Sequence, residues 1–433
     1  MRGPLPRMYA AGSRRTFAAA TVKLASAPLR RQRPLSAASP RHLWQRGISR
    51  RAKRALELLP SYLVEARSAP ASCLNLSVAE NQMLCDLLSP RLAQAGASFL
   101  DELIYYQPTP GRADMREAVA RYMSGSLYAG RYAPDPENLI IGAGCNAVLE
   151  NLFFTIAEPG SGVLVPAPYY AAFDFDLSSR AGVTVVPVVP EGLPGLPGAD
   201  LLDPAAYYPT AAALDIAYAE AEANGTPPAA LLVSSPNNPL GVVYPPEVVA
   251  EMIRWCEAKG IHYVSDEIYG GASAWAGEPE ALAAPSSAPV VMKELLGKDG
   301  LGDTVHVVYA LSKDFALSGL RVGVLYTENA AALASLQKLN DLCQTSSHTQ
   351  AVITEVLNDD GWLSDFETQA RGRLTARHAW LVSTLDKVGI EHMTSEAGLF
   401  TWMDLRPWLP AEGGEAALSR WLMNGPCCIR RRP

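Results

Sequence analysis

The chain has 433 residues, of which 48% are hydrophobic and 19% are charged, and its formal net charge is −7 at pH 7. That much apolar material is enough for a large buried core and a second, smaller one. No run of roughly eighteen or more apolar residues occurs without charges, so we expect no membrane-spanning segment. The seven cysteines are scattered and include no CxxC pair. This argues against a disulfide framework or a metal site and for a reducing compartment.

Charge is unevenly distributed along the chain. Residues 1–54 contain fourteen Lys or Arg and no Asp or Glu, whereas residues 55–433 contain 23 basic and 44 acidic residues. The excess of acidic residues in 55–433 argues against binding of nucleic acid. Residues 1–50, rich in Arg, Ser and Ala, have the composition either of a transit peptide for a mitochondrion or plastid or of a basic disordered tail. The expected location is therefore cytoplasmic or organellar.

The next elements in chain order predict an α/β fold. A helix is expected after residue 50, in "RRAKRALELLPSYLVEA". From about residue 110, short apolar runs alternate with longer amphipathic stretches, of which 145–157 and 246–259 are the clearest helices. Such runs are typical of strands that are buried on both faces. Together they predict a three-layer αβα domain with a mostly parallel sheet. The runs lie at 138–144, 162–168, 183–189, 229–236, 262–269, 305–312 and 321–326.

The C-terminal third has a different pattern. Residues 329–388 are nearly all helical in character, and "GLFTWMDL" (398–405) predicts one further strand. We therefore expect a large domain at 110–325 and a smaller α+β domain made of 51–109 and 326–433. A ligand of such a fold is expected in the crevice at the carboxyl ends of the parallel strands.

Polar residues follow several predicted strands at that edge. Small residues ending in Gly144 precede a helix that starts near Cys145 and Asn146, where backbone N–H groups can meet an anion. A tight turn is the alternative. Asp266 ends the strand of "VSDEIY", and a carboxylate there needs a cationic or hydrogen-bonding partner. Helix capping is its alternative. Lys313, in "YALSKDFALSGLRVG", follows another strand, and a desolvated lysine has a lowered pKa and can act as a nucleophile; a surface lysine is the alternative.

These residues taken together describe one ligand. It carries an anionic group, a protonated ring nitrogen that needs a carboxylate, a ring hydroxyl, an aldehyde that needs a lysine, and an aromatic face. Pyridoxal phosphate has all of these, and a lysine Schiff base with an acidic partner for the ring nitrogen is what that cofactor requires of a protein.

The same residues resemble the class I pyridoxal-phosphate-dependent aminotransferase family, which has the fold called type I. Within it they are most similar to the 1-aminocyclopropane-1-carboxylate synthase branch. The similarity covers roughly residues 50–405. It is carried in family order by "LSVAENQML" (76–84), "PAPYYAAFDFDL" (166–177), "SSPNNPLG" (234–241), "YVSDEIY" and "ALSKDFALSGLRVGVLY".

The resemblance implies catalytic roles for three residues. Lys313 would bind the cofactor covalently and, once released by the substrate amine, would move the proton at the substrate α-carbon. Asp266 would keep the ring nitrogen protonated. Tyr269 would hydrogen-bond the ring hydroxyl, together with Asn238.

It also implies the rest of the binding site and the assembly. Tyr170 would stack on the cofactor ring, with Tyr169 as the less favoured choice, and Glu80 would lie near the substrate. Family members are homodimers, so a homodimer is expected. The phosphate would be bound by Arg321, Ser312 and the backbone at Gly144, Cys145 and Asn146.

Three departures from the family pattern bear on activity. Ala310 stands where plant synthases carry a phosphate-binding serine. Thr109 stands where the family usually has an aromatic residue, which makes cyclopropane formation doubtful. Only 29 residues follow Asp404, and none of Arg430–Arg432 matches the family arginine that grips the substrate carboxylate. On this basis we expect the C-terminal part of the small domain to be shortened. We expect the chain to bind the cofactor, whose ligands lie between residues 145 and 321, but to react poorly with amino acids.

Three functions are compatible with the sequence. The first is an aminotransferase that passes the amino group of a small amino acid to a 2-oxo acid. The second is a lyase on the same scaffold, of the synthase or carbon–sulfur lyase kind. The third is a cofactor-binding homologue without activity. The amino acid itself is not specified, because specificity depends on a few pocket contacts.

Overall fold

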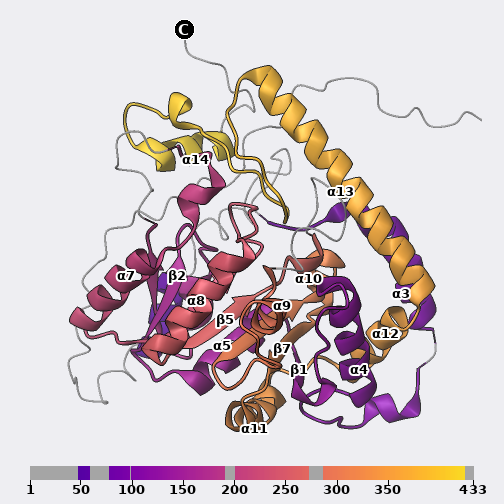
Figure 1. The fold of residues 1–433 in the computed structure, drawn as a ribbon. Helices are drawn as coiled ribbons and strands as arrows, with labels where there is room; N and C mark the ends of the chain where they lie inside the picture. The colour runs from indigo at the N-terminus through magenta and orange to yellow at the C-terminus, as the bar shows by residue number, and fades with distance from the viewer. Residues whose placement is uncertain (1–46, 59–77, 98, 191–199, 273–285, 425–433) are drawn as a thin grey trace, which may run out of the picture.

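A computed structural model of the protein describes residues 47–58, 78–97, 99–190, 200–272 and 286–424. The predicted α/β class is confirmed: seven strands form one sheet in the order β1-β7-β6-β5-β4-β2-β3, with helices on both sides (Figure 1). The strands are β1 Leu139–Gly142, β2 Gly162–Pro166, β3 Thr184–Val188, β4 Pro228–Ser234, β5 His262–Asp266, β6 Val305–Ala310 and β7 Gly323–Thr327.

The sheet is mostly parallel, as expected, with one exception. Strands β3, β2, β4, β5 and β6 pair in parallel, whereas β7 runs antiparallel to both of its neighbours, β6 and β1. The connection between β6 and β7 is short and holds the segment around Lys313. A long crossover is needed only between parallel strands, so this short connection requires β7 to turn back.

Thirteen α-helices surround the sheet within the described residues. They are α1 Arg50–Leu58, α3 Cys85–Ala95, α4 Ala113–Tyr122, α5 Cys145–Ile156, α6 Phe173–Ser178, α7 Ala211–Ala223, α8 Pro246–Lys259, α9 Ala288–Glu294, α10 Leu311–Asp314, α11 Ala330–Leu339, α12 Ser347–Leu357, α13 Asp360–Val388 and α14 Gly414–Asn424.

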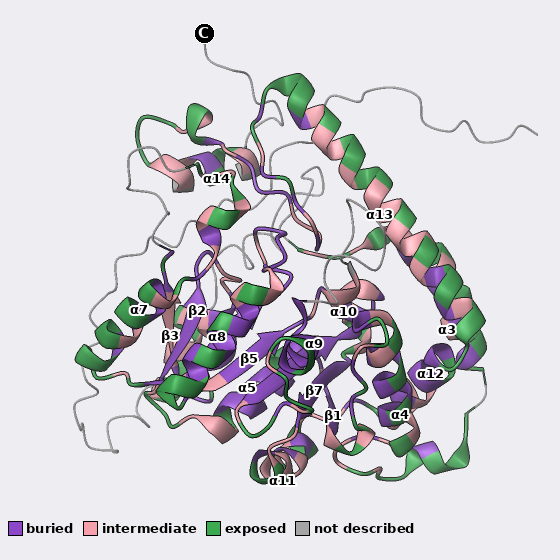
Figure 2. Ribbon diagram, viewed as in Figure 1, coloured by how far each residue is buried: buried purple, intermediate pink, exposed green. Residues whose placement is uncertain are grey.

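Two apolar cores, one on each face of the sheet, produce the three layers. Along β4, Leu231 and Val233 belong to the core under α4, α7, α8 and α9, whereas Ala230 and Leu232 face the core under α5, α6 and α11. This alternation follows from the two-residue period of a strand. Most strands are consequently buried over their full length (Figure 2), and β3 at the sheet edge is the least buried.

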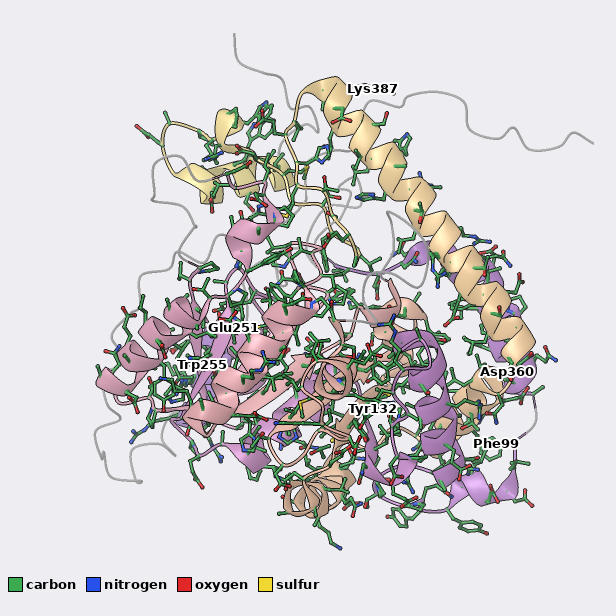
Figure 3. The ribbon with its side chains drawn as sticks, viewed as in Figure 1. Phe99, Tyr132, Glu251, Trp255, Asp360 and Lys387 are labelled. Carbon is green, nitrogen blue, oxygen red and sulfur yellow. The ribbon has the colours of Figure 1, made fainter. Side chains whose placement is uncertain are left out.

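Helix α13 runs along the outside of the molecule with its ends near Asp360 and Lys387 (Figure 3). Its 29 residues bury only Leu363, Phe366 and Leu385. The first two pack into the core on the α4 side, and Leu385 joins a separate apolar cluster near α14. The helix therefore connects two parts of the structure while exposing most of its own surface.

One predicted strand is wrong. In 398–405 the structure has an isolated bridge between His392 and Met403 and no strand. The alternating apolar residues that suggested a strand are buried for another reason: Trp402 packs beside Tyr207, and Met403 packs in the cluster with Leu385. The proposed domain boundaries stay predictions, although α11, beyond residue 325, packs on the sheet.

Candidate active site

The carboxyl ends of three neighbouring strands bring the predicted site together. Strand β4 ends at Ser234, β5 at Asp266 and β6 at Ala310. Lys313 lies one turn beyond β6, in the short helix α10. Parallel strands open their carboxyl ends at one edge of the sheet, so these side chains converge although they are distant in sequence.

Lys313 is the amine of this site. Its Nζ donates a hydrogen bond to the carbonyl oxygen of Ala79 at 2.8 Å. Burial lowers the pKa of Lys313, while the nearby Glu80, Cys145 and Asp266 oppose that shift. A lysine with a lowered pKa is more often neutral, and the neutral amine is the form that attacks carbonyls and accepts protons.

Asp266 is the buried carboxylate, with only 4% of its surface exposed. Among the described residues its hydrogen-bond donors are distant: the Ile268 N–H at 3.3 Å, the Ser234 hydroxyl at 3.5 Å and the Cys145 thiol at 3.9 Å. Burial raises the pKa of Asp266 to about 7. A buried carboxylate with such weak donors is suited to receive a stronger one, such as a protonated ring nitrogen.

A cradle for an anion lies at the start of α5. Gly144 precedes this helix with a φ of +93° and supplies no side-chain cap. The guanidinium of Arg321 fills the space that a Cβ at Gly144 would occupy, and it donates to the carbonyl oxygens of Ser318 at 3.0 Å and Ala143 at 3.3 Å. Free N–H groups at a helix N-terminus beside an arginine favour a phosphate group. Ser312 is buried in α10 on the same connection as Arg321.

Asn146 has a side-chain partner that the sequence did not suggest. Its Nδ2 donates to Asp176 Oδ2 at 2.7 Å. Asp176 is buried, and burial raises its pKa to about 6 although Asn146 and Arg321 lower it. The side chain of Asn146 therefore fixes α5 against α6, which leaves its backbone N–H as the group available to an anion.

The aromatic residues and the Asn-Asn pair are placed as follows. The ring of Tyr269 packs edge-on against Phe400 with centroids 5.0 Å apart, and Lys313 Nζ lies 5.9 Å from the Tyr269 centroid. Of the two asparagines, Asn237 is held by Tyr244 and by the Leu240 N–H, both at 3.1 Å. Asn238 is half-buried, and its contact with the ligand stays a prediction.

Tyr170 and Glu80 complete the predicted set. Tyr170 is half-buried, and its ring packs edge-on against Phe173 with centroids 5.3 Å apart. Glu80 Oε1 accepts a hydrogen bond from the Ser318 hydroxyl at 2.6 Å. Ser318 also accepts from Arg321 through its carbonyl oxygen. The segment that carries Glu80 is thereby joined to the loop between Lys313 and Arg321.

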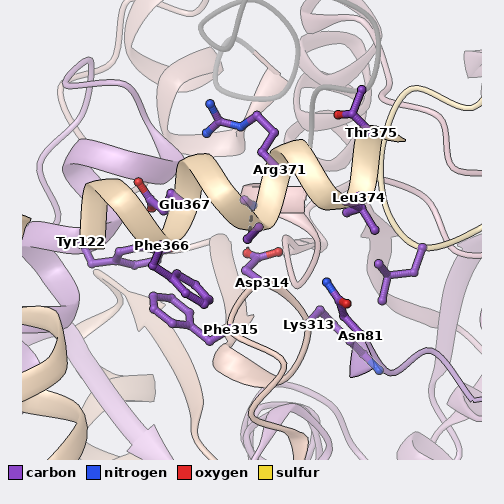
Figure 4. A pocket seen from close by; sticks show the side chains of 13 residues that line it. Asn81, Tyr122, Lys313, Asp314, Phe315, Phe366, Glu367, Arg371, Leu374 and Thr375 are labelled. Atoms are coloured by element: carbon purple, nitrogen blue, oxygen red, sulfur yellow. Dashed lines mark hydrogen bonds between the residues drawn. The ribbon is translucent and has the colours of Figure 1, made fainter. Parts of the chain in front are cut away.

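A pocket extends from Lys313 toward the middle of α13 (Figure 4). Asn81, Lys313 and Asp314 line one side of it, and α13 contributes the opposite wall. The residues from α13 are Phe366, Glu367, Ala370, Arg371, Leu374 and Thr375. The pocket combines an apolar wall with a few charged groups, which is typical of sites for small organic ligands.

The residues present fit pyridoxal phosphate. The buried Asp266 receives only long hydrogen bonds from the part of the chain that the structure describes, and the Arg321 guanidinium lies at an uncapped helix N-terminus. The described part of the chain has no group of three or more His, Cys, Asp or Glu able to hold a metal ion. No helix found in the same residues is long and apolar enough to cross a membrane.

The fold and this set of side chains define a fold type I enzyme that depends on pyridoxal phosphate. A similar fold occurs in the aspartate aminotransferase from Thermus thermophilus, solved with maleate, with a TM-score of 0.65, 23% sequence identity and coverage of 84% of this chain and 87% of that one. Residues 71–426 match the family described as aminotransferase class I and II. The chain belongs to this family.

Sequence relatives refine the comparison. The chain is 35% identical over 371 residues to 1-aminocyclopropane-1-carboxylate synthase 4 of Oryza sativa subsp. japonica. It is 34% identical over 357 residues to synthase 5 of the same rice. The matches cover 82% and 80% of this chain and 72% and 63% of the respective relatives. The predicted resemblance to the synthase branch is thereby confirmed. Arg430–Arg432 lie outside the described residues.

Proposed function

We propose that the protein is a pyridoxal-phosphate-dependent aminotransferase that transfers the amino group of a small amino acid to a 2-oxo acid. The observation that carries the proposal is the pairing of two groups at adjacent strand ends. Lys313 is an amine whose pKa burial lowers, and Asp266 is a buried carboxylate with weak donors. When bound, the cofactor supplies an aldehyde that reacts with amines and a ring that withdraws electrons from the substrate α-carbon.

The side chains of this chain have distinct tasks in the proposal. Lys313 Nζ holds the cofactor and then removes and returns the proton at the substrate α-carbon, as a general base and acid. Asp266 keeps a proton on the ring nitrogen through a charge-assisted hydrogen bond. Asn238 and Tyr269 donate to the ring hydroxyl, and Tyr170 covers the ring face.

The remaining groups bind and orient. Arg321, Ser312 and the N–H groups at Cys145 and Asn146 hold the phosphate, which fixes the cofactor in one position. Glu80 lies beside Lys313, where it contributes to the polarity of the substrate pocket. Fixing the reacting groups in this way lowers the barrier because less freedom is lost in the transition state.

A lyase on the same scaffold is the second candidate. The named relatives are 1-aminocyclopropane-1-carboxylate synthases, and Glu80 is the residue that the synthase branch uses near the substrate. Thr109, in place of the usual aromatic residue, favours transamination over cyclopropane formation. A homologue that binds the cofactor without reacting is the third candidate.

The product stoichiometry separates the three candidates. Purified holoprotein is mixed with a panel of amino acids, first without and then with a 2-oxo acid. An aminotransferase forms one 2-oxo acid per site without the acceptor and turns over only when the acceptor is present. A lyase needs no acceptor and turns over continuously. It expels a leaving group from the substrate and releases with it either a 2-oxo acid together with ammonia or a cyclic amino acid. No reaction with the whole panel indicates the silent homologue.

A homodimer is part of the proposal. The segment just before Thr109 exposes Phe99, Leu100, Ile104 and Tyr105, and Tyr106 is fully exposed. Contiguous apolar side chains on a surface favour a protein partner, and a second copy of the chain is the partner that we expect. Light scattering should give a dimer mass, and Ile104→Asp should shift it toward the monomer.

A further inference from the structure

Asp314, the neighbour of Lys313, is half-buried at the edge of the pocket and has no role assigned to it in the proposed cofactor site. Its Oδ2 accepts hydrogen bonds from the Gly271 N–H and from the Tyr309 hydroxyl, both at 2.9 Å. Gly271 lies in the turn Gly270–Ala272 that follows β5, and Tyr309 lies in β6. One carboxylate oxygen therefore joins the turn of Lys313 to the turn that follows Asp266.

The hydrogen-bond network of Asp314 continues through Tyr309 to helix α4. The hydroxyls of Tyr309 and Tyr122, from α4, are 3.2 Å apart, and both rings are buried. Tyr122 also packs edge-on against Phe315 with centroids 5.1 Å apart. Burial raises the pKa of both tyrosines well above the usual value, and the Asp314 charge adds to this. Both hydroxyls are therefore neutral and able to donate.

Gly271 shows how closely the two turns approach. A Cβ added there would lie 2.7 Å from Asp314 Oδ2 and 3.2 Å from the Tyr122 hydroxyl. Only glycine allows the backbone N–H to reach the carboxylate at this distance. The Asp314 carboxylate thus explains the glycine at position 271.

Helix α10 is anchored at its start by Leu311, which is buried in the core and donates its N–H to the Val322 carbonyl oxygen at 3.2 Å. It contains four residues, Leu311–Asp314, and has no side-chain cap at its start. The direction in which the Lys313 side chain leaves the backbone depends on this single turn. A side-chain oxygen that accepts two donors in a poorly solvated site holds both partners in one arrangement.

We propose that Asp314 is a positioning residue, which keeps the Lys313 amine in a fixed position relative to the Asp266 carboxylate. It does so by fixing α10 to the turn Gly270–Ala272 and to Tyr309. The inference rests on the proposed function only in taking Lys313 as the amine that captures pyridoxal phosphate. Asp314 itself touches neither cofactor nor substrate in this account.

The test compares four variants in the full-length protein. Asp314→Asn retains an oxygen acceptor, Asp314→Ala removes it, and Tyr309→Phe removes one donor. Tyr132→Phe is the matched control, because Tyr132 is also a buried tyrosine whose hydroxyl donates to a carboxylate, Glu328, at 2.7 Å. The main readout is the rate at which the visible absorbance band develops when apoprotein is mixed with pyridoxal phosphate. The thermal midpoint, kcat and KM are measured alongside it.

The expected results are graded. Asp314→Ala should slow development of the band and lower kcat by about tenfold to a hundredfold, with KM changed by less than about threefold, because a misplaced reacting group costs rate. Tyr309→Phe should lie between Asp314→Ala and the unaltered protein. Asp314→Asn should stay within about threefold of the unaltered protein, and Tyr132→Phe should match it in rate.

Two outcomes would overturn the proposal. One is an Asp314→Ala protein that binds the cofactor at the unaltered rate. The other is an Asp314→Asn protein as slow as Asp314→Ala, which would make charge rather than the held geometry the cause. If Asp314→Ala does not fold, Tyr309→Phe against Tyr132→Phe decides, and equal rates refute the proposal. Failure of the unaltered protein to react with amino acids refutes the proposed function alone, since the cofactor rates are measured without substrate.

Discussion

Strands β5 and β6 carry buried polar groups at both of their ends, and the two ends differ in how those groups are satisfied. Near their starts, His262 Nδ1 and His306 Nε2 are 3.0 Å apart, and His306 Nδ1 lies 2.8 Å from the Thr327 hydroxyl. At the other end, counting the described residues, Asp266 has only distant donors and Lys313 Nζ donates to one acceptor, the Ala79 carbonyl oxygen. Buried polar groups are normally fully hydrogen-bonded. The hydrogen-bonded histidines at the starts of the strands therefore stabilise the fold. The carboxyl ends, where Asp266 and Lys313 have few hydrogen bonds, are suited to bind a ligand.

Among substitutions at the carboxyl ends of β5 and β6, replacement of Lys313 should have the largest effect on activity. Lys313→Ala and Lys313→Arg should both lower the rate of amino-acid turnover by at least about ten-thousandfold, because neither side chain can bind the cofactor covalently and move the α-carbon proton. Their thermal midpoints should be close to that of the unaltered apoprotein. Borohydride reduction of the unaltered holoprotein should place the cofactor on Lys313, and a label on another lysine would refute this assignment.

Asp266→Asn should come next. The amide cannot keep the ring nitrogen protonated, so turnover should fall on the order of a thousandfold. Apoprotein stability at pH 7 and above should rise, because burial penalises the Asp266 carboxylate once it is ionised. The measurement is kcat together with the chemical unfolding midpoint. Near-normal turnover would remove Asp266 from the proposed role.

Gly144→Ala should weaken phosphate binding more than it weakens the fold. The added Cβ would overlap the Arg321 guanidinium, which can swing away but then leaves the phosphate. We expect a tenfold to hundredfold loss of affinity for pyridoxal phosphate, roughly one lost charge-assisted hydrogen bond. Gly160→Ala is the matched control: its φ is +95°, close to the +93° of Gly144, but no atom lies within 4 Å of its Cβ. Equal losses in both variants would assign the effect to backbone strain.

The smallest effect is expected at the starts of β5 and β6, where the buried histidines are hydrogen-bonded. It should be a dependence of the unfolding free energy on pH. Burial lowers the pKa of His306 to about 3. Unfolded chains bind a proton below about pH 6.5 and the folded protein does not, so the contribution of His306 to stability is present above pH 6.5 and is lost as the pH falls toward 3. It should amount to about 2 kcal/mol between pH 7 and 5.

The variant His306→Gln isolates this contribution. Its unfolding free energy should fall less between pH 7 and 5 than that of the unaltered protein, by that same amount. Asp266 has the opposite slope, because its raised pKa makes stability decrease as the pH rises from about 4 to 7. Since both proteins contain Asp266, its effect cancels in the difference. Identical pH slopes in the two proteins would show that His306 is not the group responsible.

Local sequence patterns predicted the features that depend on neighbouring residues, namely the strands and the polar side chains at their ends. Apolar runs marked all seven strands, and the strand ends pointed to Lys313 and Asp266. The same patterns misassigned 398–405, because alternating burial arises there from two separate clusters rather than from pairing in a sheet. Residue roles in the cofactor site stay predictions, since the structure supplies their placement and not their chemistry.

Side-chain contacts between segments that are distant in the chain could not be predicted from the sequence. The bond from Asn146 to Asp176 and the one from Glu80 to Ser318 join residues 30 and 238 positions apart. Asp314 stood in the quoted lysine segment, but its partner Gly271 comes from another strand end 43 residues away. No periodicity encodes such pairs, because each depends on how the sheet brings its strand ends together.

The length of α13 has a mechanical consequence. At about 1.5 Å per residue, its 29 residues span about 43 Å, and its buried side chains lie close to its two ends. A rigid rod of that length converts a tilt of about 5° at the Leu363 end into a displacement of roughly 3 Å near Leu385. The middle of the same rod forms a wall of the pocket beside Lys313. Small angular changes at its base would thus alter the width of the pocket and the position of the outer apolar cluster together.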